Sequence, residues 1–445
     1  MYKEIIDWID FILVPLYLMV FLLILVWIKK RNRDNVLIQK YLIKGFLFKV
    51  ACAIFYCLLL QFYYGYGDSL TYFKDAIFIQ HQVRTGNETF KILLMDNFYG
   101  RDVHGIIGSG NEGGWIVEKL AFLLSYISFY RYLIVTMFFA LLAYSGMFKM
   151  LVTFNDIMPG WDKRLALIIL FFPSLAVYGS GVLKDTICMT SLGWLLYSSH
   201  QLFGKKQFKL KYILILLLCI TLIGVVKIYI IAAFIPSYIF YLIILLVKKI
   251  QNGFVRKLIL PFMLLMAVGT YFIFEDAIDN SLGSYSMEKL FDTVKEQQGL
   301  YLGAEDADKG SVFSLGTFEP TLGGFISKMP AGIAATIYRP YIWESKKVIM
   351  LFSALESFLL LWFTLYVMYK TGIGQFFKII YKDPFIFLCL TYSLIFAALI
   401  GLSTFNFGTL ARYRIPMIPF YACGILAILY NYQKANPKKP LQNPA

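Results

Sequence analysis

The sequence predicts an all-helical protein that crosses a membrane many times. Of its 445 residues, 59% are hydrophobic, and the mean hydropathy is +0.67. A soluble domain cannot bury that much apolar surface, whereas a bilayer accommodates it. Aromatic residues make up 18% of the chain, which suits the belts of Tyr and Trp at membrane interfaces. We therefore expect one transmembrane domain over residues 1–445.

Eleven apolar segments are candidates for membrane-spanning helices. A crossing helix needs about 20 apolar residues, and somewhat fewer within a tight hairpin. The first span is expected to be retained, because the charges on its N-terminal side are mainly acidic and it has no small-residue cleavage site. The predicted spans are 9–28, 46–64, 132–152, 165–180, 184–202, 212–226, 228–247, 258–274, 349–369, 384–402 and 415–432.

Short connections predict two helical hairpins within this series. Segment 165–202 turns at Gly179-Ser180-Gly181, and segment 212–247 turns near Lys227. The apolar run 115–130 contains charges at Glu118 and Lys119. We therefore predict that this run forms an interfacial helix lying against the membrane.

The distribution of charge predicts the orientation. Placing alternate loops in the cytoplasm collects 24 of the 42 basic residues there, against four acids. The opposite side then holds 18 basic and 22 acidic residues, and Glu356 lies within a span. This asymmetry follows the positive-inside rule. It predicts a multi-pass membrane protein with its N-terminus outside and its C-terminus in the cytoplasm.

Two long segments are predicted on the outer face, at 65–131 and 275–348. Loops of this length are uncommon unless they carry function. We expect the first to contain interfacial helices and to be the candidate active-site loop. The second is rich in acidic residues between 275 and 308.

Several classes of function are disfavoured by the sequence. The three histidines show no metal-ligand spacing, and the six cysteines lie in apolar runs, so neither a metal site nor a disulfide framework is predicted. No P-loop or nucleophile elbow occurs, which argues against nucleotide hydrolysis and serine hydrolase chemistry. The net charge of +15 reflects membrane loops, and we expect no nucleic-acid partner.

The first candidate site is Asp68, Tyr72 and Asp75 in the first outer loop. On a helix these spacings place all three side chains on one face. One carboxylate could then act as a general base toward an acceptor hydroxyl, with Tyr72 orienting it. The alternative is an ordinary helix start, in which Asp68 or Ser69 is the N-cap and Asp75 is solvated.

A second candidate lies in the predicted turn before residue 184. Lys184 could bind a phosphate with help from the N–H groups of the following helix. The alternative is a salt-bridged turn capped by Asp185. Lys227, at the next predicted outer turn, is a further candidate for binding, although such a lysine can also extend its ammonium group to the interface.

Arginines near the last span form the third candidate. Arg412 and Arg414 lie on the predicted outer face, and their planar guanidinium groups suit a pyrophosphate headgroup. The alternative is anchoring to lipid headgroups. Arg339 has a similar setting. Glu356 is an intramembrane acid, either functional or paired structurally with an arginine at an outer helix end.

The pattern Gly67, Asp68, Ser69, Tyr72 and Ala76 resembles the first-loop motif of C-fold (GT-C) integral membrane glycosyltransferases. The order of an interfacial helix, a span starting at Arg131 and a hairpin from Pro173 to Asp185 is similar to that family. The closing sequence Arg412-Tyr413-Arg414-Ile415-Pro416 resembles bacterial surface-polysaccharide and O-antigen polymerases. Two features depart from the pattern: the motif follows the second span, and Ser69 stands where many relatives have a second acid.

The resemblance implies transfer of a sugar from a polyprenyl-phosphate or pyrophosphate donor on the extracytoplasmic face. It implies a hexosyltransferase of polysaccharide biosynthesis in the cell envelope, located as a multi-pass protein in a bacterial inner (plasma) membrane. Asp68 would act as base or position the acceptor. The partners implied are the lipid-linked donor, a glycan or lipid acceptor, and membrane lipids. A divalent cation is left open, and no other cofactor is implied.

Two other functions fit the same residues. A flippase or transporter of lipid-linked oligosaccharides would use the cations to bind the headgroup but would need no base. A non-catalytic membrane protein of an envelope-assembly complex would need neither the headgroup-binding cations nor a base. The sequence leaves the oligomeric state open.

Overall fold

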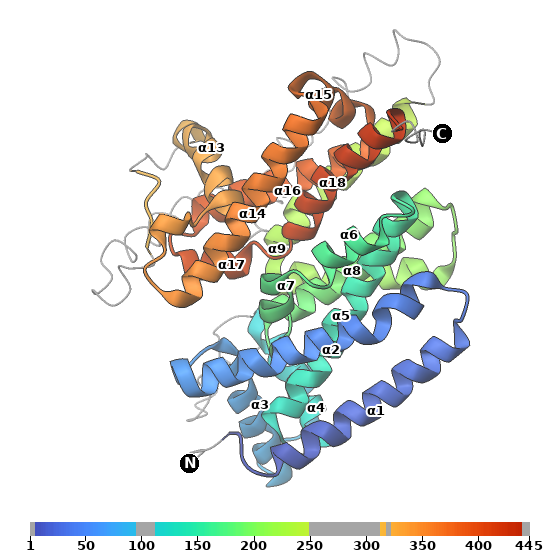
Figure 1. The fold of residues 1–445 in the computed structure, drawn as a ribbon. Helices are drawn as coiled ribbons and strands as arrows, with labels where there is room; N and C mark the ends of the chain where they lie inside the picture. Colours follow the sequence, from blue (N-terminus) through green and yellow to red (C-terminus); the bar gives the residue numbers. More distant parts are fainter. Residues whose placement is uncertain (1–4, 95–111, 249–311, 317–321, 438–445) are drawn as a thin grey trace, which may run out of the picture. The chain divides into compact units, whose positions relative to one another are not determined.

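A computed structural model describes residues 5–94, 112–248, 312–316 and 322–437 of the chain (Figure 1). Within the described residues, the regular secondary structure consists of helices and one isolated bridge between Val312 and Asn406. Two predictions lie outside the described residues: the span 258–274 and the acid-rich stretch 275–308. Contacts group the chain into two compact units, 1–231 and 232–445, and each is described by itself.

Six helices of the described ranges are long and apolar enough to cross a membrane, or seven if one bent pair is counted as a span. The bent pair is α17 (Phe407–Tyr413) with α18 (Ile418–Ala435), at an angle of 66°. The π-helical η1 (Leu59–Tyr64) extends the second of the six. The six are α1 (Asp10–Arg31), α2 (Val36–Leu58), α5 (Tyr132–Ile157), α9 (Leu210–Val247), α14 (Val348–Thr371) and α16 (Pro384–Ser403).

The predicted hairpin 165–202 takes a different form. Its first arm is two short helices, α6 (Asp162–Ile169) and α7 (Pro173–Tyr178), so the prediction of one helix over 165–180 is wrong. The cause is local: Phe172 precedes a proline and is extended, with ψ of 122°, because the proline ring disfavours helical geometry in the residue before it. The second arm is α8 (Lys184–Ser199), followed by the π-helical η3 (His200–Gly204).

The segment predicted as the hairpin 212–247 is one element, α9, which counts as a single candidate span and is kinked at the predicted turn position. Lys227 has φ of −152° and ψ of 80°, which are not helical values. The predicted interfacial run is also helical, as α4 (Glu112–Ile127). Its position relative to a membrane stays a prediction.

In the first unit, α5 is the central helix and packs against α2 and α8. Before α5 come α3 (Asp68–Arg84), the short η2 (Phe90–Leu94) and α4. Arg131, just before α5, bonds to Asp7 with 2.6 Å between Nη1 and Oδ2. This bond lowers the pKa of the Asp7 carboxyl and ties the start of the chain to the α4–α5 turn.

The contact between α5 and α8 depends on glycine. A Cβ on Gly193 would lie 2.0 Å from the carbonyl oxygen of Gly146, and one on Gly146 would lie 2.3 Å from that of Thr190. Small residues at such positions let helix backbones approach closely, which is how many membrane helices associate.

Replacing Gly193 by Ala is expected to destabilise the first unit, because the added methyl must push α5 and α8 apart at a cost of about 1–3 kcal/mol. Thermal unfolding in detergent can be followed with a thiol-reactive dye, since five of the six cysteines are buried and Cys52 is half-buried. The matched control is Gly224→Ala in α9, where a Cβ meets nothing within 4 Å. Equal melting temperatures for the two variants would contradict the close contact.

The second unit contains the remainder of α9, the candidate spans α14 and α16, the bent pair α17–α18, and three further helices. These are α13 (Leu322–Tyr338), η5 (Ile342–Glu344) and α15 (Ile373–Lys382). Helix α13 falls within the predicted outer loop 275–348 and packs against α16. Thr336 joins the two by donating to the carbonyl oxygen of Ala397 at 2.9 Å.

Candidate functional site

Helix α3 starts at Asp68, and its N-cap is Gly67, which makes no side-chain cap hydrogen bond. The interpretation of Asp68 or Ser69 as the N-cap is therefore wrong. Gly67 has φ of +147°, and a Cβ there would lie 2.9 Å from Leu60, so the turn favours glycine. Asp68 is the first helical residue and is exposed, and the helix dipole favours a carboxylate there.

Ser69, the next residue, is fully buried and joins three segments of the first unit. Its Oγ accepts a hydrogen bond from the backbone N–H of Val182 at 3.0 Å and lies 2.8 Å from the Tyr132 hydroxyl. Val182 lies two residues before the first residue of α8, and Tyr132 begins α5. The start of α3 is thereby held against the start of α8.

Tyr72 and Asp75 point into the protein, being only 3% and 1% exposed. The alternative that Asp75 is solvated is wrong. The Lys184 ammonium lies 5.9 Å from the centre of the Tyr72 ring, close enough for a cation–π contact. Asp68 lies one helical turn before Tyr72 on the same side of α3. Asp68, which is exposed, and Lys184, which is half-buried, therefore lie at the same helix junction, with Tyr72 beside Lys184.

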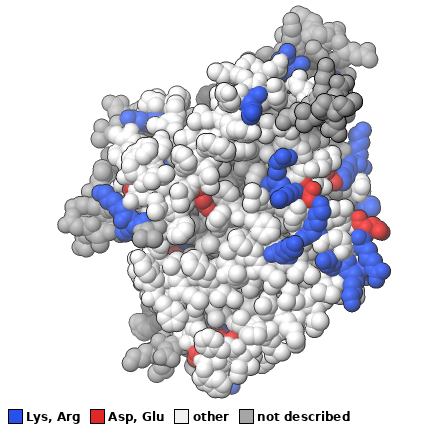
Figure 2. Space-filling model, viewed as in Figure 1, with Lys and Arg blue, Asp and Glu red and all other residues white. Residues whose placement is uncertain are grey.

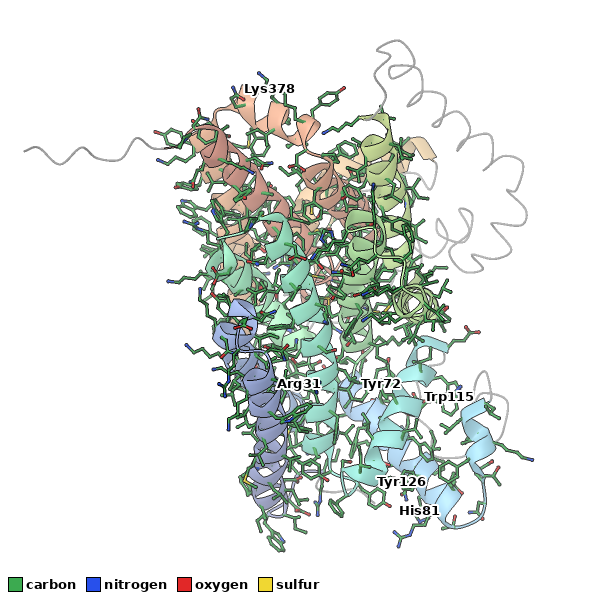
Figure 3. The ribbon with its side chains drawn as sticks, turned by 90° about the vertical axis from the view of Figure 1, so that its right-hand side faces the viewer. Arg31, Tyr72, His81, Trp115, Tyr126 and Lys378 are labelled. Carbon is green, nitrogen blue, oxygen red and sulfur yellow. The ribbon has the colours of Figure 1, made fainter. Side chains whose placement is uncertain are left out.

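Helix α4 covers another side of α3 (Figure 3). In this view Tyr72 and Trp115 lie toward one end of the pair, and His81 and Tyr126 lie toward the other. Glu118 of α4 is 1% exposed. From the sequence, the charge of Glu118 indicated an interfacial helix, but the burial of its carboxyl group was not predicted.

Asp185 and Lys227 form a buried ion pair, with 2.5 Å between Oδ1 and Nζ. Asp185 does not cap α8, because the N-cap is Leu183 and makes no side-chain cap bond. Lys227 is 6% exposed, so the alternative that it extends to the interface is also wrong. The pair fastens α8 to the break in α9.

Sequence reasoning also missed Lys49, in the middle of α2. Its side chain is 1% exposed, and Nζ donates to the carbonyl oxygen of Leu175 at 3.0 Å. Leu175 belongs to the short α7, where a broken helix leaves carbonyl groups in need of donors. The available signal was a lone lysine in the apolar run 46–64.

In the second unit, Arg414 is fully buried and bridges several elements. Its Nη1 donates to Ser357 Oγ at 2.8 Å and to the carbonyl oxygen of Arg339 at 3.0 Å. Its Nη2 lies 3.9 Å from Glu356 Oε2. We predicted from the sequence that an arginine could be the structural partner of Glu356, and Arg414 is such a partner. These contacts explain both residues without a substrate.

Arg339 is paired with Glu344 and lies against aromatic rings, with its guanidinium 5.0 Å from the centre of Phe313 and 5.2 Å from that of Phe407. Arg412 is half-buried in α17. Of the predicted site residues, the structure brings Asp68, Tyr72 and Lys184 together in the first unit, beside the Asp185–Lys227 pair. Arg414, Glu356 and Arg339 gather in the second unit. Convergence of the two groups stays a prediction.

Within the described part of the chain, no three His, Cys, Asp or Glu side chains are grouped so as to hold a metal ion. The accessible polar groups at the α3–α8 site are a carboxylate, an ammonium and the starts of two helices. Such a site can accept a proton and bind an anion. A scan against protein-family models and searches of curated proteins and solved structures give no match for this chain.

Proposed function

We propose that the protein is a membrane glycosyltransferase or polysaccharide polymerase that uses a polyprenyl-phosphate-linked or pyrophosphate-linked sugar donor. The single observation that carries the proposal is the junction made by Ser69, which holds the start of α3, with the exposed Asp68, against the start of α8, with the half-buried Lys184. The proposal includes about 11 crossings in a GT-C-like arrangement, with the N-terminus outside, in a bacterial inner membrane.

The chemistry follows from these groups. Lys184 and the first N–H groups of α8 would bind the donor phosphate and stabilise the charge that develops on it. The acceptor hydroxyl attacks the anomeric carbon of the sugar and passes its proton to Asp68. The bond from that carbon to the phosphate oxygen breaks, and the phosphate or pyrophosphate leaves with the electron pair. The donor already stores the energy, so no nucleotide is required.

Exposure assigns the roles among the candidate residues. Asp68 is accessible, whereas Asp75 and Asp185 are buried, so Asp68 is the proposed base and the other two are proposed to hold the site in place. Tyr72 would orient Lys184 through its ring. Arg412 stays the candidate for phosphate binding in the second unit.

Asp68→Asn is expected to reduce sugar transfer by roughly 10²–10⁴-fold, the usual contribution of a general base. The measurement is incorporation of radiolabelled sugar from a lipid-linked donor in membranes. The matched control is Glu112→Gln, which removes another exposed acid from the first turn of a helix in the same unit. Equal incorporation by Asp68→Asn and the wild type would remove Asp68 from the catalytic role.

Broken helices favour a flippase or transporter of lipid-linked oligosaccharides as the second candidate. The α6–α7 segment is interrupted, and α17 and α18 bend by 66°; discontinuous helices form the substrate sites of many transporters. In reconstituted vesicles, a transporter with Asp68→Asn would still move a fluorescent lipid-linked oligosaccharide between leaflets. A transferase would bind the donor, form no product and move no lipid. A non-catalytic assembly protein would tolerate loss of Asp68, Lys184 and Arg412 without change in either assay.

A further inference from the structure

A cavity with a basic rim lies in the first unit, among residues that take no part in the α3–α8 site. The end of α1, the first half of α2 and the start of α6 enclose about 1000 Å³. Figure 2 shows Lys and Arg side chains gathered at the right-hand edge of the view, where Figure 1 places the turn between α1 and α2. Five cations line the cavity: Lys29, Lys40, Lys44, Lys163 and Arg164.

Acidic side chains do not neutralise this rim. Asp162 borders it and accepts hydrogen bonds from Lys40 Nζ at 2.9 Å and Tyr41 Oη at 2.8 Å. The bond from Lys40 lowers the pKa of the Asp162 carboxyl, so this acid is ionised at neutral pH. Among residues that the structure describes, Lys40 is the only one of the five cations in an ion pair. Four cations remain in excess around one cavity.

Part of the lining of the cavity is apolar. Leu167 and Phe171 line it, and Leu167 is 64% exposed. The cavity also lies at the ends of two candidate spans, since Lys29 is in the last turn of α1 and Lys44 in the third turn of α2. A basic rim beside an exposed apolar wall at a membrane boundary matches an amphiphile with an anionic head.

We propose that this cavity binds the phosphodiester headgroup of an anionic membrane phospholipid, with Lys44 and Lys163 contacting the phosphate and Leu167 and Phe171 contacting the acyl chains. The site is independent of the proposed sugar transfer and lies on the predicted cytoplasmic face. The positive-inside rule requires cations near helix ends, but it does not require cations from three helices to share one cavity with an apolar wall.

Native mass spectrometry of the full-length protein tests this proposal. The detergent-solubilised protein is titrated with dioleoyl-phosphatidylglycerol, and dioleoyl-phosphatidylcholine serves as the neutral lipid. Phosphatidylglycerol is expected to bind more tightly. Lys44→Gln with Lys163→Gln should weaken its binding roughly 25-fold, because each lysine near an anionic surface contributes about fivefold. Lys44→Arg with Lys163→Arg keeps the charge and should retain binding.

The matched control is Lys206→Gln with Lys209→Gln. Both of these lysines are exposed and lie outside the cavity, so removing them should leave phosphatidylglycerol binding unchanged. If both double variants weakened phosphatidylglycerol binding equally, the loss would follow from the lower net charge, and the proposed site would be contradicted. A third arm adds inorganic phosphate: if it displaces phosphatidylglycerol at millimolar concentration, the occupant is a soluble anion and the lipid assignment fails. Thiol-dye melting of each variant confirms that losses of binding occur in folded protein.

Discussion

Replacing Lys227 by Met is expected to lower the stability of the first unit by about 3–5 kcal/mol, because the change leaves a buried carboxylate without its charge partner. The Asp185 side chain is fully buried, and its Oδ1 lies 2.5 Å from Lys227 Nζ. The consequence should be seen at Cys188, one turn further along α8 and also buried. Its reaction with a thiol-reactive dye should occur at a lower temperature than in the wild type.

The control for Lys227 is the double variant Asp185→Leu with Lys227→Met. Replacing both members of a buried ion pair by apolar residues often restores stability, so the double variant should melt well above Lys227→Met alone. If the two melt together, the stabilising role of the pair is contradicted. A double variant that melts normally but transfers no sugar would instead assign the pair to the substrate.

Replacing Arg414 by Met is expected to have a similar effect on the second unit, again about 3–5 kcal/mol. The change leaves the buried Glu356 without the guanidinium 3.9 Å away and removes the donor to Ser357 at 2.8 Å. Arg414→Lys should recover only part of the loss, because an ammonium cannot reproduce the planar fork. Thermal melting in detergent measures both variants.

Arg412→Met is the matched control for Arg414. Arg412 lies two residues away and is half-buried rather than buried. Its replacement should leave the melting temperature close to that of the wild type and, under the proposed function, reduce sugar transfer. If Arg412→Met destabilised the protein as much as Arg414→Met, the prediction that the buried contacts of Arg414 cause the loss of stability would be contradicted.

Hydropathy predicted the long helices well. The runs that became α1, α5, α14 and α16 are apolar over about 20 residues, and such runs have few alternatives to a spanning helix. The segment 165–180 is equally apolar but broken, because a single proline at position 173 outweighs hydropathy where the helix would have to continue. Helix α13 lies within the predicted loop 275–348. Its packing against α16 is a long-range contact that a single sequence does not show.

The sequence predicts the local part of the candidate site but not the contacts between distant segments. Asp68 and Tyr72 are four residues apart, so helical spacing alone related them. Lys184 is more than a hundred residues away, and only the shared outer face of the predicted topology linked it to them. The partners of Asp185 and Arg414 depend on long-range packing, and Lys49 was missed because one lysine hardly changes the hydropathy of its run.

The bonding of Ser69 has a consequence for how this site can evolve. Many members of the resembled family carry a second acid at this position, next to the first. Here the two adjacent side chains diverge: Asp68 faces outward, whereas the Ser69 hydroxyl is buried between Val182 and Tyr132. An acid introduced at position 69 would point inward, away from Asp68, and would replace the hydroxyl that joins three helices. Acquiring a pair of carboxylates here would require rebuilding the helix junction, and a single substitution would not suffice.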